Sequence, residues 1–78
     1  MQKAYTPPAP SNLRAFFPEA LKFYRKHAKY TQEELGLASG ISSTHISHFE
    51  AGRRLPSLDN FKDLVIALNV PPQELLGL

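Results

Sequence analysis

The chain has 78 residues, 42% of them hydrophobic, and a net charge of +2, which allows one globular domain with a small core. It contains no cysteine, so disulfide bonds and thiolate metal cages are excluded, and its 3 histidines could not close a structural zinc site without carboxylate ligands. No apolar run is long enough to span a membrane, and the start lacks the apolar segment of a signal peptide, so we expect a cytoplasmic protein.

Positive charge is concentrated in the first part of the chain. Residues 1–29 hold six of the 9 Lys and Arg residues and only one of the 7 Asp and Glu residues. Such asymmetry is typical of proteins that dock electrostatically on phosphates. Small soluble domains also show it by chance, so charge alone does not identify a partner.

The N-terminal part is rich in proline. The stretch TPPAP at residues 6–10 cannot be helical, and we expect residues 1–15 to form a mobile arm ahead of a domain at 16–78. Pro18 suits the first turn of a helix and is predicted to begin the first helix, EALKFYRKHA. The inward stripe of this helix comprises Leu21, Tyr24 and Ala28.

A second apolar stripe lies partly off that face. It comprises Phe16, Ala20 and Phe23. We expect the phenylalanines Phe16, Phe17 and Phe23 to be covered by the N-terminal segment of the chain itself. The alternative is that these three residues form the surface for a protein partner.

A capping box marks the start of a second helix. Thr31 suits the cap position, and Glu34, three residues further on, can reach back to the cap backbone. This short helix is predicted to run through Ala38, with Leu35 and Ala38 facing inward. Gly40 is predicted to end it in a left-handed conformation.

Capping residues and apolar periodicity predict two further helices and a final turn or short helix. Ser42 caps a third helix at about 43–50, Ser57 caps a fourth, and Asn69 ends the fourth. The last element runs from Gln73 to Leu76. The apolar positions of the fourth helix are Leu58, Phe61, Leu64, Val65 and Leu68. No segment alternates with the period of a strand, so the predicted fold is all-α with four to five helices.

The third predicted helix has an unusual outer face. Two short helices joined by a glycine turn indicate a helix-turn-helix. The face opposite the apolar residues is polar but uncharged, and it comprises Ser43, Thr44, Ser47 and His48. Solvation alone would normally recruit Lys and Glu to such a face, so we expect it to form hydrogen bonds with a partner.

A longer ordered set of residues surrounds this motif without a gap. It comprises Arg25, TQEEL at 31–35, Gly40-Ile41-Ser42, Ile46-Ser47, Phe49-Glu50-x-Gly52, Pro56-Ser57-Leu58 and Leu64 through Leu68. Through these residues, the stretch from Leu21 to Leu76 resembles the DNA-binding domain of Cro and the phage repressors, often called the XRE family. The resemblance implies a lambda-repressor-like domain with a helix-turn-helix.

Two positions depart from the family pattern. Gly36 stands where the family usually has Ala, and Ser39 stands where it usually has Ala or another apolar residue. Gly36 allows a close approach of the two helices but costs about 1 kcal/mol of helix propensity.

The resemblance implies roles for individual residues. A recognition helix presents its N-terminal residues to base edges in the major groove. The base-reading candidates are Ser43, Thr44 and His48, none of which offers the bidentate contact of Arg, Asn or Gln. The phosphate-binding candidates are Gln32, Ser42, Ser47, Arg53 and Arg54. The resemblance also implies that Arg25 and Glu50 form an ion pair inside the domain.

The expected function is a sequence-specific transcriptional regulator, most simply a repressor, that binds a palindromic operator in double-stranded DNA as a homodimer. By resemblance, the dimer contacts involve the loop at 55–57, the start of the fourth helix, and Leu75, Leu76 and Leu78. No spacing suggests a catalytic base beside a nucleophile, and we expect no enzyme activity, cofactor or metal. The alternative is a protein-interaction module or an antitoxin-type regulator that uses the same fold to bind a protein partner.

Overall fold

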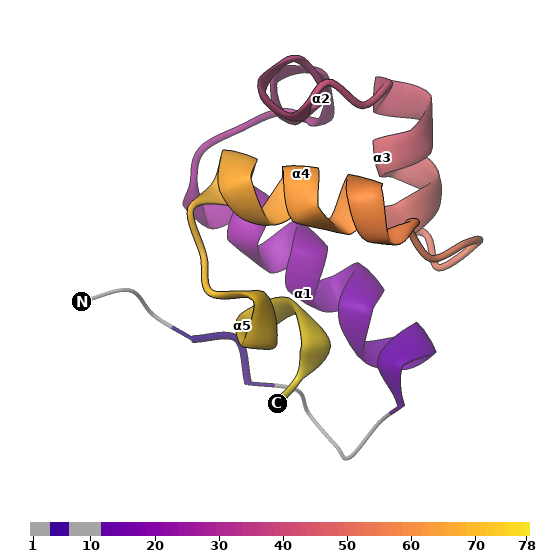
Figure 1. Ribbon diagram of the computed structural model, residues 1–78, viewed down its shortest axis with the longest axis vertical. Coiled ribbons are helices and arrows are strands. Elements are labelled where there is room, and N and C mark those ends of the chain that lie inside the picture. Colours follow the sequence, from indigo (N-terminus) through magenta and orange to yellow (C-terminus); the bar gives the residue numbers. More distant parts are fainter. Residues whose placement is uncertain (1–3, 7–11) are drawn as a thin grey trace.

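Five helices follow one another in the computed structural model, which describes residues 4–6 and 12–78 (Figure 1). They are α1 (Leu13–His27), α2 (Gln32–Ser39), α3 (Ser43–Glu50), α4 (Leu58–Leu68) and α5 (Pro72–Leu76). No strand occurs within the described residues, as the sequence periodicity predicts. None of their helices is long and apolar enough to cross a lipid bilayer. The arm predicted at residues 1–15 lies partly outside the description, at 1–3 and 7–11.

The start of α1 differs from the prediction. Asn12 caps the helix, because its side chain accepts a hydrogen bond of 3.0 Å from the backbone N–H of Ala15. Pro18 does not begin the helix but lies inside it, where its missing N–H removes one backbone hydrogen bond. Its ring is buried beside Gly52, in the turn after α3. The prediction was wrong because Asn12 and the buried Phe16 and Phe17 extend the helix backward past the proline.

Two alanines predicted to face inward are exposed. Ala28 is the C-cap of α1, where the chain turns away through Lys29 with a φ of 64°. Ala38 is exposed because the buried face of α2 is centred on Leu35 and Gly36. In both helices, the apolar pattern near the C-terminal end covers too few residues to predict which side of the last turn faces the core.

The predicted helix caps are present. The hydroxyl of Thr31 accepts a hydrogen bond of 3.0 Å from the Glu34 N–H, and the Glu34 carboxylate accepts one of 2.8 Å from the Thr31 N–H. Ser42 and Ser57 cap α3 and α4 through their hydroxyls. Gly40 ends α2 with a φ of 75°, a left-handed conformation that glycine adopts without steric cost.

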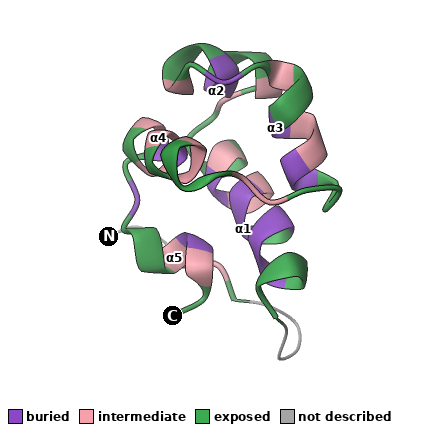
Figure 2. Cartoon of the chain, turned by 45° about the vertical axis from the view of Figure 1, so that its right-hand side comes forward, coloured by how far each residue is buried: buried purple, intermediate pink, exposed green. Residues whose placement is uncertain are grey.

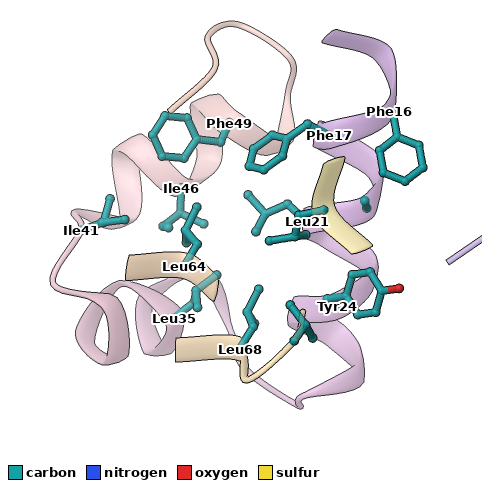
Figure 3. Packing of buried hydrophobic residues seen from close by; sticks show 13 residues of the cluster. Phe16, Phe17, Leu21, Tyr24, Leu35, Ile41, Ile46, Phe49, Leu64 and Leu68 are labelled. Atoms are coloured by element: carbon teal, nitrogen blue, oxygen red, sulfur yellow. The ribbon is translucent and has the colours of Figure 1, made fainter. Parts of the chain in front are cut away.

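Buried apolar side chains form one cluster to which α1, α2, α3, α4 and α5 all contribute (Figure 3). Its members are Phe16, Phe17, Ala20, Leu21, Tyr24, Leu35, Ile41, Ile46, Phe49, Leu64, Leu68, Val70 and Leu75. Helix α1 packs on α3 and α5, whereas α2 packs on α3 and α4. The core therefore fixes the orientation of α3 from two sides.

The phenylalanines of α1 are covered largely as predicted. The ring of Tyr5 packs against Phe16 and Phe23, with ring centroids 5.4 and 5.5 Å apart. Phe17 is covered by the core instead, including Phe61 of α4, whose centroid lies 6.2 Å away. Phe16 and Phe17 are buried and expose little surface, and a protein partner at Phe16, Phe17 and Phe23 stays a prediction.

Candidate nucleic-acid interface

The polar face of α3 points away from the core. Ile46 and Phe49 are buried on one side of the helix, which fixes its rotation. Figure 2 shows that α3 carries buried residues together with intermediate and exposed ones. The residues on the other side of the helix are half-buried or exposed, and they are Ser43, Thr44, Ser47 and His48. We name these four residues the polar face of α3.

At the start of α3, a side chain caps one backbone N–H group, and the other N–H groups of the first turn have no partner within the helix. The Ser42 hydroxyl accepts a hydrogen bond of 3.2 Å from the His45 N–H and lies 3.1 Å from His45 Nδ1. The His45 ring is also stacked on Phe49, at a centroid distance of 6.3 Å. Because the Ser42 side chain is used in the cap, its phosphate-binding potential lies mainly in the backbone N–H groups of the first turn.

The predicted ion pair between Arg25 and Glu50 is present and ties α1 to the end of α3. Arg25 Nε donates to Glu50 Oε2 at 2.6 Å, and Nη2 donates to Oε1 at 3.0 Å. A third donor of Arg25 bonds the carbonyl of Tyr30 at 2.8 Å. The side chains are only 11% and 3% exposed, so the two charges compensate each other out of water.

Gln32 joins this network. Its side-chain Nε2 donates to Glu50 Oε1 at 3.2 Å, which connects the start of α2 to the end of α3. The side chain is therefore engaged inside the protein, and it orients the first turn of α2 rather than lying free for a phosphate. An anion site at the N–H groups of that turn stays a prediction.

Two arginines flank the other end of the polar face. The turn after α3 includes Gly52, with a φ of 76°, and the Arg53 N–H donates to the His48 carbonyl at 3.0 Å. Arg53 and Arg54 are both exposed. Their charges are thus placed beside uncharged hydrogen-bonding groups, as expected for a surface that meets phosphates around base edges.

Gly36 sets the distance between α2 and α3. A Cβ atom at this position would lie 2.6 Å from the carbonyl oxygen of Ile41, closer than real Cβ contacts allow. The close approach inferred from the sequence is therefore present. Ser39 accommodates its polar group locally, since its hydroxyl donates to the Leu35 carbonyl at 2.7 Å.

One exposed apolar residue near the interface was not singled out from the sequence. Leu37 is 86% exposed and, together with Glu33 and Ser43, lines a groove of about 460 Å³ between α2 and α3. The sequence signal that could have indicated this residue was the position of Leu37 outside the buried stripe of α2. Among the described residues, no group of three or more His, Cys, Asp and Glu side chains could hold a metal ion.

Helix α3 packs on both α1 and α2 and follows a glycine turn. Its polar face points outward between two arginines and a helix start. These features define a helix-turn-helix DNA-binding domain. A family model described as helix-turn-helix matches residues 21–75. The chain belongs to this family of DNA-binding transcription regulators, of the Cro and phage-repressor type.

Three known proteins are similar to this chain over most of its length. It is 34% identical over 67 residues to the control protein C.BamHI of Bacillus amyloliquefaciens, which covers 85% of this chain and 83% of that protein. The restriction-modification controller protein C.AhdI of Aeromonas hydrophila has a TM-score of 0.76 and 32% identity, covering 80% of this chain and 94% of that one. The DNA-binding domain of the P22 C2 repressor has a TM-score of 0.74 and 32% identity, with 80% and 83% covered.

Proposed function

We propose that the chain is a sequence-specific regulator that binds a two-fold symmetric operator as a homodimer and represses transcription by occupying promoter DNA. The observation that supports this most is the polar face of α3, whose uncharged hydrogen-bonding groups point outward. Ile46 and Phe49 are buried on the opposite side and fix the rotation of the helix. A controller-type role is also compatible with this site, and the similarity to the restriction-modification controller C.AhdI favours it.

Base reading is assigned to Ser43, Thr44 and His48. Hydroxyl groups donate or accept hydrogen bonds, and the Thr44 methyl group suits the methyl group of thymine. Each residue makes single rather than bidentate contacts, so discrimination per contact lies toward the low end of the roughly 1–3 kcal/mol of a bidentate pair. DNA shape then contributes part of the specificity.

Phosphate binding is assigned to two groups on either side of this face. The first group is the helix starts at Gln32 and Ser42, where backbone N–H groups and the positive end of the helix dipole attract an anion. The second is the side chains of Ser47, Arg53 and Arg54. These contacts fix the register of the protein on DNA and give salt-dependent affinity without reading sequence.

Dimerisation is assigned to an apolar groove of about 160 Å³ at the edge of the domain. It is lined by Leu13, Phe17, Leu55, Pro56, Leu58, Phe61 and Leu76, and we name it the apolar groove. Leu58 is 87% exposed beside it, so a second copy could insert this side chain reciprocally. Leu75, expected at the interface from the resemblance, is fully buried in the core, so we do not assign it to the interface.

The test is selection of bound sequences from random duplex DNA at about physiological salt, where specific and non-specific binding separate. We expect enrichment of a two-fold symmetric site with half-sites about one helical turn apart. Salt-sensitive binding without enrichment would reject the proposal and favour the interaction-module alternative.

A triple variant then tests the assigned readers. Ser43→Ala with Thr44→Ala and His48→Ala should lower the preference for the selected site at least tenfold and leave the melting temperature nearly unchanged. The matched control is Glu19→Ala with Lys62→Ala and Gln73→Ala, which changes three exposed residues without altering net charge. Unchanged selectivity in the first variant would refute the assignment of the readers.

A further inference from the structure

A short N-terminal segment lies against the domain at the end opposite the helix-turn-helix. Residues 4–6 run beside α5 (Figure 1), and we name them the N-terminal strap. Tyr5 is half-buried, and its ring contacts Phe16 edge-on and Phe23 at a tilt. Aromatic pairs in these geometries are favourable beyond the area that they bury.

A polar route leads from the strap to α5. The Tyr5 N–H donates to the Tyr24 hydroxyl oxygen at 2.8 Å, and that hydroxyl donates to Glu74 Oε2, also at 2.8 Å. Tyr24 is 1% exposed, and its oxygen points away from the centre of the core cluster (Figure 3). Burial raises the pKa of Tyr24 and the Glu74 carboxylate adds to this, while the hydrogen bond from Tyr5 lowers it. The hydroxyl therefore keeps its proton at neutral pH and remains a donor to Glu74.

Apolar contacts connect Tyr5 with the C-terminal end of α5. The ring of Phe16, which Tyr5 covers, packs directly on Gly77, the C-cap of α5. A Cβ atom at Gly77 would lie 3.3 Å from three carbons of this ring, and the backbone there has a φ of 75°. Only glycine suits both the left-handed conformation and this contact without displacement.

The two routes reach α5 on either side of Leu76, which lines the apolar groove. Helix α5 is only five residues long and has no side-chain cap at its start, so its position depends on tertiary contacts rather than on intrinsic helix stability. Leu75 anchors it in the core, and Glu74 and Gly77 fix its rotation through Tyr24 and Phe16.

We infer that the N-terminal strap controls dimerisation, because its docking on α1 positions α5 and thereby shapes the apolar groove for a second copy. This inference rests on the dimer of the proposed function and adds its regulation. Any event that removes Tyr5 from α1, such as capture or trimming of the N-terminus, weakens the dimer and with it operator binding. By linkage, dimerisation in turn favours the docked strap.

The first experiment compares Tyr5→Ala with the control Thr6→Ala, an exposed neighbour in the same strap. The dimer dissociation constant is measured on the full chain by sedimentation equilibrium. We expect it to rise on the order of tenfold in Tyr5→Ala, from the loss of two aromatic contacts, and to stay unchanged in Thr6→Ala. A wild-type dimer that Tyr5→Ala leaves intact overturns the inference alone, whereas a wild-type protein that stays monomeric overturns the proposed dimer as well.

The second experiment reads the position of α5 directly. The amides of Gly77 and Leu78 both donate to the Gln73 carbonyl, at 2.9 and 3.1 Å, so their hydrogen exchange reports whether the end of α5 is formed. At a dilution where the protein is monomeric, we expect faster exchange of both amides in Tyr5→Ala and in Tyr24→Phe. Unchanged exchange in both variants would show that the strap does not position α5 and would overturn the inference.

Discussion

The helix-turn-helix and the α1–α5 end of the molecule are held together by different kinds of contact. Helices α2 and α3 are bounded by local caps that join residues three positions apart, such as Thr31 with Glu34 and Ser42 with His45. The other end depends on hydrogen bonds that span 19 residues, from Tyr5 to Tyr24, and 50 residues, from Tyr24 to Glu74. The first region presents the polar face of α3 outward and uses Gln32 and Glu50 internally, whereas the second uses Tyr24 and Glu74 internally. Local contacts therefore define the ends of α2 and α3, whereas the position of α5 depends on contacts between segments far apart in the sequence.

The largest expected effect would break the link between these regions. Glu50→Ala leaves the largely buried side chain of Arg25, 11% exposed, without its carboxylate, and we expect the free energy of unfolding to fall by about 3–5 kcal/mol. Urea denaturation measures the change. The control is Glu19→Ala on the exposed side of α1, which should change stability by less than about 0.5 kcal/mol. Comparable losses in the two variants would contradict the role of the pair.

A second substitution tests the rigidity of the helix-turn-helix. Gly36→Ala should destabilise the domain by about 1–3 kcal/mol, because the added Cβ would meet the Ile41 carbonyl. Helix propensity alone predicts the opposite sign, a gain of about 1 kcal/mol. Thermal unfolding decides between the two. As a reference on the exposed side of the same helix, Ala38→Gly should show only the propensity loss. A more stable Gly36→Ala variant would refute the steric argument.

The smallest expected effect concerns the α1–α5 end and depends on pH. Tyr24→Phe removes the hydroxyl that joins Tyr5 to Glu74 and should lower stability by about 1 kcal/mol at neutral pH. The folded state favours the protonated hydroxyl, because the pKa of Tyr24 is raised mainly by burial. Its contribution is therefore fully present below the usual tyrosine pKa of about 10 and is lost as pH rises through the raised value.

The measurement for Tyr24 is the free energy of unfolding of wild type and variant between neutral pH and the alkaline transition. The advantage of wild type should shrink only above a pH of about 10. Tyr30→Phe, at a tyrosine outside this network, should retain the wild-type pH profile. A difference between wild type and Tyr24→Phe that does not change with pH would mean that the hydroxyl does not couple to the fold.

Sequence predicted the helix-turn-helix well because its signals are local. The caps at Thr31, Ser42 and Ser57 predicted the starts of α2, α3 and α4, and Gly40 and Asn69 predicted the ends of α2 and α4, nearly to the residue. The Arg25–Glu50 pair followed from family resemblance and not from spacing, since its members lie 25 positions apart. The assignment of individual residues to bases and phosphates stays a prediction.

The remaining features were overlooked in the sequence or depend on contacts between distant segments. The start of α1 was misplaced because the preference of proline for a first helical turn was given more weight than the cap at Asn12. The covering of the phenylalanines was expected, but nothing in the sequence pointed to the hydrogen bonds of Tyr24. Contacts between distant segments leave no periodicity to detect.

The missing side chain at Gly36 has a consequence for how the protein fits a curved partner. At Gly36, the backbone of α2 lies closer to the Ile41 carbonyl than an alanine side chain would allow, so α2 and α3 pack tightly against each other. On the proposed operator, we expect the DNA rather than this tightly packed helix pair to deform. Flexible pyrimidine–purine steps at positions the protein never touches would lower the cost of that deformation. The choice of binding site would thus depend partly on the mechanics of the DNA.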